Sequence, residues 1–211
     1  MNSHTQAFFL TGAAGRLQCA LDLPDEAEFA APRGIALVAH PHPLFGGTMD
    51  NKVAHTLARS FVALGYATAR MNFRGVGESE GVHDDGHGET DDMELLLAEM
   101  QRRYPGVPLA LAGFSFGSFV QALLQQRLIA QARPAERLAL VGTAAGKWPM
   151  PTVPADTILI HGELDETIPL ADVFNWARPQ DLPVIVITGA DHFFHRKLQH
   201  IKHHVVELWH R

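Results

Sequence analysis

The chain has 211 residues, of which 46% are hydrophobic and 19% charged, and its formal net charge is −6. This composition supplies enough apolar side chains for a large buried core, which excludes a disordered or fibrous protein. The acidic balance argues against nucleic acid or an anionic membrane surface as a partner, so we expect a small-molecule substrate. The length fits a single domain that spans residues 1–211.

The predicted elements begin with two apolar segments, 7–10 and 17–23, which flank a glycine-containing turn and indicate an antiparallel hairpin at a sheet edge. Beyond the hairpin, short apolar runs alternate with helical stretches, the pattern of a mostly parallel sheet covered by helices on both faces. The predicted strands are 34–39, 67–72, 109–114, 138–141, 157–160 and 184–187. The predicted helices are 51–64, 89–104, 116–129, 170–177 and 196–209.

The strand at 109–114 leads into the sequence GFSFG at 113–117, and a predicted helix follows at once. A GxSxG motif between strand and helix is typical of a nucleophile elbow, in which a strained turn presents the serine hydroxyl. The N–H groups at the start of a helix favour negative charge, such as the oxyanion that forms during acyl transfer. We therefore expect Ser115 to be a catalytic nucleophile.

A serine hydroxyl needs a general base, and the base needs a third group to orient it. Candidates follow the last two predicted strands: Glu163, Asp165 and Glu166 come after 157–160, and His192 comes after 184–187. The carboxyl ends of parallel strands share one side of a sheet, so these side chains can converge on Ser115. The residues alone leave the choice among the three acids open, whereas position sets His192 apart from the other histidines.

Five motifs occur in order: HPHPLFGGTM at 40–49, NFRGVGES at 72–79, GFSFG at 113–117, HGELD at 161–165 and DHFF at 191–194. Together they resemble the α/β-hydrolase superfamily, and more closely the small lidless bacterial serine hydrolases of dienelactone-hydrolase-like type. The resemblance runs from about residue 34 onward.

This resemblance implies an α/β-hydrolase fold in which Ser115 is the nucleophile, Asp165 the orienting acid and His192 the general base. Dienelactone hydrolases themselves use a cysteine nucleophile, so their lactone substrate is not carried over.

The resemblance also implies an oxyanion hole made of two backbone N–H groups. One belongs to the residue after the nucleophile, here Phe116, and the other to the loop that follows the first long strand. Two prolines in that loop have no N–H, so only His42 or Leu44 can be the donor. We favour Leu44, with His42 as the alternative, and we expect His40 to shape the loop through side-chain hydrogen bonds.

The connection at 142–156 between two later strands is too short to build a helical lid. We therefore expect an open, shallow site whose apolar substrate contacts come from Phe45, Phe114, Trp148 and Met150. Such a site holds little of a long acyl chain out of water, which favours short-chain soluble esters.

The sequence thus predicts a serine hydrolase that cleaves small carboxylic esters through an acyl-enzyme, with no cofactor and no metal. The alternatives are a thioesterase or amidase with the same three residues, or a non-catalytic binding module on this fold. The histidine- and acid-rich stretch at 83–89 has no recognised metal-ligand spacing. Without a signal peptide or membrane segment in the sequence, we expect a cytoplasmic monomer or homodimer.

Overall fold

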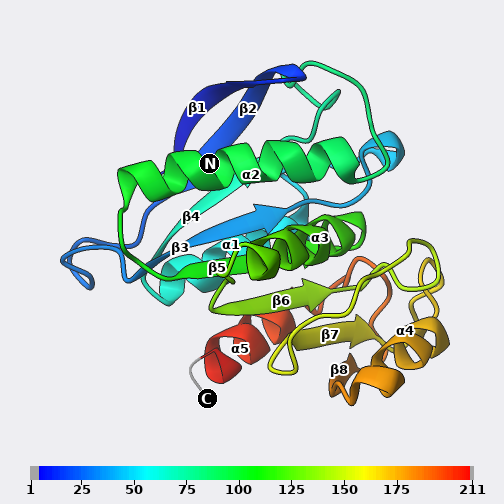
Figure 1. Cartoon of the computed structure of the whole chain (residues 1–211). Coiled ribbons are helices and arrows are strands. Elements are labelled where there is room, and N and C mark those ends of the chain that lie inside the picture. The colour runs from blue at the N-terminus through cyan, green and yellow to red at the C-terminus, as the bar shows by residue number, and fades with distance from the viewer. Residues whose placement is uncertain (1–4, 210–211) are drawn as a thin grey trace.

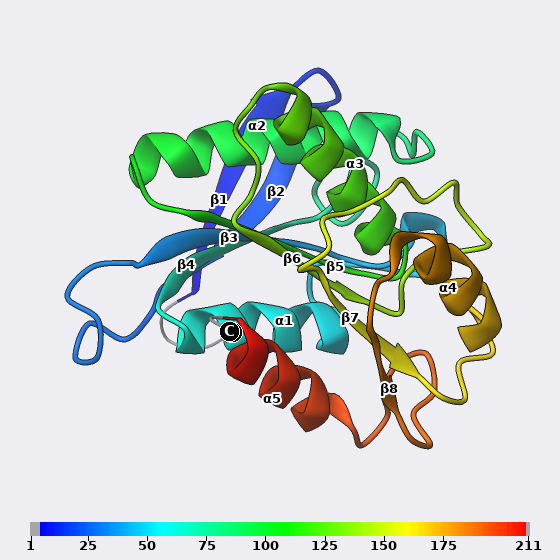
Figure 2. The same ribbon diagram turned by 60° about the horizontal axis from the view of Figure 1, so that its bottom comes forward.

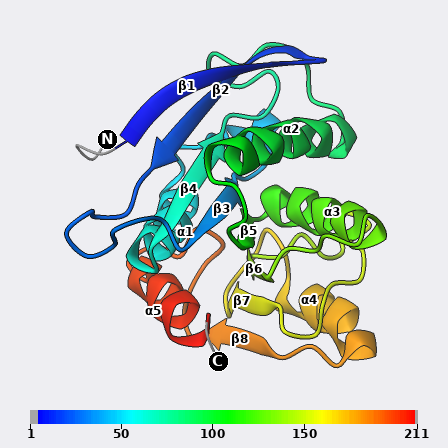
Figure 3. The same ribbon diagram turned by 60° about the vertical axis from the view of Figure 1, so that its left-hand side comes forward.

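The computed structural model describes residues 5–209, which build an eight-stranded sheet with helices on both faces (Figure 1). The sheet order is β1-β2-β4-β3-β5-β6-β7-β8; β2 pairs antiparallel with β1 and β4, and all pairs from β4 to β8 are parallel. The strands are β1 (Thr5–Gly12), β2 (Gly15–Asp22), β3 (Gly34–Ala39), β4 (Tyr66–Met71), β5 (Leu109–Phe114), β6 (Arg137–Val141), β7 (Ile158–Gly162) and β8 (Val184–Ile187). This is the expected α/β-hydrolase architecture, including the hairpin at the edge (Figure 3).

The helices divide between the two faces of the sheet, as Figure 2 shows. They are α1 (Lys52–Ala63), α2 (His87–Arg103), α3 (Phe116–Ala130), α4 (Leu170–Ala177) and α5 (Leu198–Leu208). Helices α1 and α5 cover one face, while α2, α3 and α4 cover the other. A hydrophobic core lies on each face of the sheet, and alternate residues of β3 point into one core or the other. Ala36 and Val38 face α1, and Leu37 faces α2 and α3. Both faces are covered, which explains why these strands are continuously apolar.

Three helices start at residues other than the predicted ones, two because of a side-chain hydrogen bond and one because of a positive φ. Asn51 lies outside α1, because its Oδ1 accepts the backbone N–H groups of Val53 and Ala54. Helix α2 starts before residue 89, because the Glu89 carboxylate folds back to accept the Gly86 N–H. Helix α5 begins two residues late, since Arg196 has a φ of 61° and cannot belong to a helix.

The parallel strands point the same way, so the segments that follow β3, β5, β7 and β8 gather at one edge of the sheet (Figure 1). A 3₁₀ turn, η1 (Pro43–Phe45), lies in the first of these segments. No element inserts over this edge between β6 and β7, where the chain from 142 to 157 has no regular helix or strand. None of the helices between residues 5 and 209 has the length and hydropathy needed to cross a membrane.

Candidate active site

Ser115 lies at a sharp turn between β5 and α3, with φ 55° and ψ −123°. The turn forms because two glycines leave room for it: a Cβ on Gly113 would lie 2.2 Å from the carbonyl oxygen of Gly117. A Cβ on Gly117 would in turn lie 2.4 Å from the carbonyl oxygen of Ala39. A non-glycine residue with this backbone is strained and is held there only by its surroundings. The elbow expected from the GxSxG motif is therefore present.

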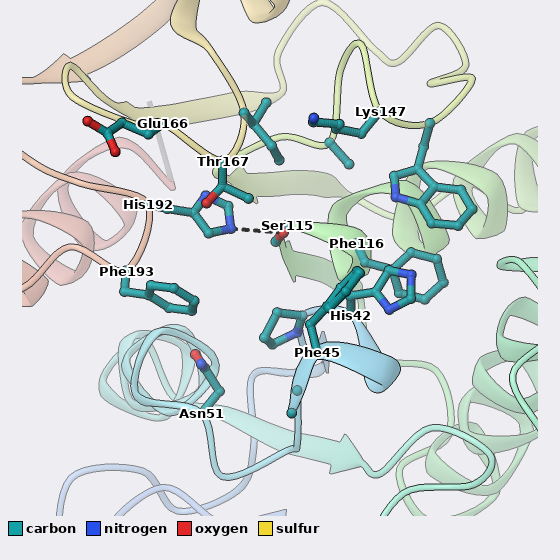
Figure 4. Close-up of a pocket in the computed structure, with 16 residues that line it drawn as sticks. His42, Phe45, Asn51, Ser115, Phe116, Lys147, Glu166, Thr167, His192 and Phe193 are labelled. Carbon is teal, nitrogen blue, oxygen red and sulfur yellow. Dashed lines mark hydrogen bonds between the residues drawn. The ribbon is translucent and has the colours of Figure 1, made fainter.

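His192 and Asp165 meet Ser115 from the ends of two other strands. Nε2 of His192 lies 3.0 Å from Oγ of Ser115 (Figure 4), and its Nδ1 lies 2.7 Å from Oδ2 of Asp165. The carboxylate makes Nδ1 the protonated ring nitrogen, which leaves Nε2 to accept from the serine hydroxyl. All three side chains are buried, and Ser115 and His192 also line a cavity.

The three acids left open by the sequence have different partners. Oδ1 of Asp165 accepts the backbone N–H groups of Thr167 and Ile168, at 2.9 and 2.7 Å, which fixes the carboxylate facing His192. Glu163 instead accepts the N–H of Gly189 at 2.7 Å. Glu166 is exposed and lines the cavity without a hydrogen bond or ion pair to any described residue. Among the three, Asp165 is hydrogen-bonded to His192.

Two buried rings, those of His161 and Phe114, lie behind the hydrogen-bonded side chains of Ser115, His192 and Asp165. His161 places Nε2 2.9 Å from the carbonyl oxygen of Ile168 and 3.4 Å from Oδ2 of Asp165, and burial lowers its pKa. Phe114 is fully buried beneath His192, with ring centroids 4.9 Å apart. Phe114 thus supports the imidazole and does not line the cavity, contrary to its predicted role as a substrate contact.

His40 ties the loop after β3 to the neighbouring loop after β4. Its Nδ1 donates to the carbonyl oxygen of Pro41 at 2.6 Å, and its Nε2 accepts the N–H of Phe73 at 2.9 Å. The imidazole is fully buried, and burial lowers its pKa to about 3. The neutral ring shapes this loop through hydrogen bonds on both nitrogens, as expected.

The predicted oxyanion donors need a correction. The N–H of Leu44 donates to Nδ1 of His42 at 3.2 Å, and the Leu44 side chain is 70% exposed and does not line the cavity. Our preference for Leu44 therefore does not fit the structure. The alternative, His42, lines the cavity beside Ser115, and its N–H has no hydrogen-bond acceptor within residues 5–209. Phe116 opens α3, so its N–H has no acceptor within the helix.

The cavity has a volume of about 660 Å³, a size typical of small-molecule sites. One side is an aromatic wall, formed by His42, Phe45, Phe116 and Trp148. Figure 4 shows His192 and Phe193 across Ser115 from His42 and Phe116.

Of the four predicted substrate contacts, Phe45 and Trp148 line the cavity, whereas Phe114 and Met150 do not. Met150 packs against the core on the α3 side of the sheet. The sequence did not single out Asn51, Lys147, Thr167 or Phe193, which also line the cavity. Two of these could have been inferred from position: Phe193 follows His192, and Lys147 precedes Trp148.

No group of three or more His, Cys, Asp or Glu side chains within residues 5–209 is arranged to hold a metal ion. In the acidic stretch at 83–89, His83 instead pairs with Glu89, with Nδ1 and Oε1 2.9 Å apart.

Comparison with known proteins identifies relatives over most of the chain. Residues 32–198 match the family described as serine aminopeptidase, S33. An uncharacterized protein of Rickettsia prowazekii is 32% identical over 179 residues, which cover 78% of this chain and 74% of that protein.

Two solved structures are similar over almost their whole length. A serine hydrolase without a lid from Xanthomonas campestris is 33% identical with a TM-score of 0.89, covering 99% of this chain and 96% of that one. An α/β serine hydrolase homologue from Coxiella burnetii is 31% identical with a TM-score of 0.85, covering 96% of both chains.

Proposed function

We propose that this chain, which belongs to the serine aminopeptidase S33 family of α/β hydrolases, cleaves small carboxylic esters through an acyl-enzyme on Ser115. The observation that carries the proposal is the hydrogen-bonded series from Ser115 through His192 to Asp165. This series is buried except where it opens into a cavity of ligand size. A nucleophile, a base and an orienting acid in this order are what acyl transfer requires.

In the first step, Oγ of Ser115 attacks the ester carbonyl carbon while Nε2 of His192 takes the hydroxyl proton. Asp165 keeps the proton on Nδ1 and stabilises the imidazolium that forms. The tetrahedral oxyanion accepts hydrogen bonds from the N–H groups of His42 and Phe116. The positive end of the α3 dipole adds to this stabilisation.

The imidazolium then donates its Nε2 proton to the leaving alcohol oxygen, and the C–O bond breaks. A water molecule, deprotonated by the same nitrogen, attacks the acyl-serine, and the acid leaves as Ser115 recovers its proton. The leaving oxygen must approach His192, so the acyl substituent extends toward the opposite side of Ser115. That side carries the aromatic wall (Figure 4).

Amide cleavage is the second candidate, because the matching family is described as an aminopeptidase. An aminopeptidase must hold the free ammonium group of its substrate next to the acyl carbonyl. Of the two charged side chains within residues 5–209 that line the cavity, Lys147 lies beside the wall, next to Trp148, and would repel an ammonium group. The carboxylate of Glu166 lies on the side of His192 instead (Figure 4). The charges around Ser115 therefore favour an ester substrate.

A fluorophosphonate probe and a matched substrate panel test the proposal. We expect the probe to label Ser115, and the label to disappear in Ser115→Ala. Ser60→Ala is the control, since within residues 5–209 that hydroxyl bonds only to the carbonyl oxygen of Thr56 in its own helix. Acetyl esters should be cleaved faster than the matching thioester, amide and aminoacyl anilide. Failure of both labelling and turnover would indicate a non-catalytic binding module, and faster amide cleavage would favour the second candidate.

A further inference from the structure

The aromatic wall is a continuous cluster centred on His42. The ring centroid of His42 lies 4.8 Å from that of Phe45, 4.9 Å from that of Phe116 and 5.5 Å from that of Trp148. Phe116 and Trp148 are also in contact, with centroids 4.9 Å apart. These separations lie in the range preferred by interacting aromatic pairs. The four rings therefore form one surface rather than four isolated contacts.

Other side chains hold this surface from behind. Trp148 stacks on Phe119, with centroids 5.4 Å apart and planes at 23°. The His83 ring, whose side chain is 9% exposed, packs against both His42 and Phe116, and the fully buried carboxylate of Glu89 holds it through Nδ1. A wall fixed in this way loses little conformational freedom when a ligand binds.

The front of the wall is uncovered at Phe45, His42 and Trp148, whereas the Phe116 ring is 1% exposed and supports them from within. Phe45 is 85% exposed at the cavity mouth, on the 3₁₀ turn η1. A single exposed apolar side chain needs no explanation, but this one continues a ring surface that lines a cavity of ligand size. A flat apolar group placed against it would cover the exposed ring and contact several others. A saturated chain of equal carbon number lacks the flat face and the quadrupole that such contacts use.

We propose that the site takes esters of arylalkanoic acids, whose aromatic ring stacks on the wall while the carbonyl lies at Ser115. The inference rests on the proposed ester hydrolysis. It names the substrate class. It also places the aromatic ring in the acyl part, because the leaving oxygen must lie beside His192, across Ser115 from the wall. The linker between the aromatic ring and the carbonyl carbon should be short, because the wall residues His42 and Phe116 adjoin Ser115.

Two substrate pairs of matched carbon skeleton test both parts of the inference. The first pair, ethyl phenylpropanoate and ethyl cyclohexylpropanoate, carries the ring in the acyl part. The second pair, phenylethyl acetate and cyclohexylethyl acetate, carries it in the alcohol. We expect kcat/KM to favour the aromatic member of the first pair by about 3- to 10-fold, the size of an aromatic contact, and to be nearly equal within the second.

Substitutions show which side chains cause the preference for the aromatic member of the first pair. Phe45→Leu and Trp148→Leu keep an apolar side chain without a ring, so each should move the ratio of the first pair toward one. Phe193→Leu makes the same change across Ser115 and should leave that ratio as it is. Phe9→Leu, on the outer strand β1, should change neither ratio nor rate. Equal rates within the first pair would overturn the inference, and selectivity confined to the second pair would overturn the acyl assignment.

Ethyl acetate and product binding separate this inference from the proposed function. An enzyme that cleaves ethyl acetate without aromatic selectivity retains the proposed function and refutes the wall as a ring site. If no ester is cleaved, the proposed function fails by itself. Calorimetric binding of phenylpropanoate and cyclohexylpropanoate to Ser115→Ala still tests the wall in that case. Equal affinity would refute the inference, and preference for phenylpropanoate that Trp148→Leu removes would support it.

Discussion

Acidification should destabilise this protein through His40. The buried ring donates from Nδ1 to Pro41 and accepts on Nε2 from the N–H of Phe73. If Nε2 also carried a proton, it would become a donor. It would then face the N–H of Phe73, which is itself a donor and would lose its acceptor. Burial accordingly lowers the pKa of His40 from 6.5 to about 3. The loop that this ring fixes also carries His42.

The size of the effect follows from the difference in proton uptake between the two states. The unfolded chain protonates His40 below a pKa of 6.5, whereas the folded chain does so only near 3. The stabilisation is therefore fully present above pH 6.5 and is lost as the pH falls toward 3. At about 1.36 kcal/mol per pH unit, the free energy of unfolding should fall by about 2 kcal/mol between about pH 7 and pH 5.

Urea unfolding of wild type and His40→Gln at these two pH values isolates this contribution. Glutamine can donate to Pro41 and accept from Phe73 but does not titrate. We expect His40→Gln to be less stable than wild type near neutrality, and the difference to shrink by about 2 kcal/mol at the lower pH. His87→Gln, exposed on α2, is the control for removing an imidazole. An unchanged difference between wild type and His40→Gln would refute this reasoning.

Four further changes test the site. Ser115→Ala should lower ester turnover by about 10⁴-fold or more, as measured by kcat/KM, while Tm changes little. Ser115→Gly should be equally inactive but more stable than Ser115→Ala by about 1 kcal/mol in urea unfolding, because glycine relieves the positive φ of 55°. Asp165→Asn should approach the loss of His192→Ala, whereas Glu163→Gln should be mild; a severe Glu163 variant would contradict the assignment. Across straight-chain esters, each added methylene should gain far less than ~0.8 kcal/mol in transition-state binding. A steady rise of kcat/KM to long acyl chains, or activation at a lipid interface, would show that the site is covered.

The sequence predicts the sheet and the residues around Ser115 well, because both leave strong local patterns. Strands buried on both faces are continuous apolar runs, and three of them, β3, β5 and β8, begin and end at the predicted residues. The elbow motif and the shared edge of the parallel strands suffice to bring His192 to Ser115. The choice of Asp165 needed the resemblance to a family, because three acids lie within four positions of one loop.

The donor in the oxyanion loop and part of the cavity lining could not be predicted, because they depend on tertiary geometry. Which N–H faces the cavity is decided by the 3₁₀ turn η1, in which the His42 side chain uses the N–H of Leu44. Whether Phe114 meets the substrate or supports His192 depends on the direction in which its strand position points. Met150 is apolar like Trp148, yet it packs on the core and Trp148 lines the cavity.

The anchoring of Trp209 has a consequence for the order in which the site is completed during synthesis. Its indole N–H donates to the hydroxyl of Tyr66 at 2.9 Å, and its ring packs edge-on against Phe61 with centroids 4.7 Å apart. Arg137 also binds the carbonyl oxygens at the end of α5, including that of Trp209 at 3.1 Å. The segment bearing His192 is thus held between β8 and a helix whose far end is fastened to residues made much earlier. We therefore expect a growing chain to form the elbow at Ser115 before His192 has a fixed place, and the two residues to meet only when α5 has docked.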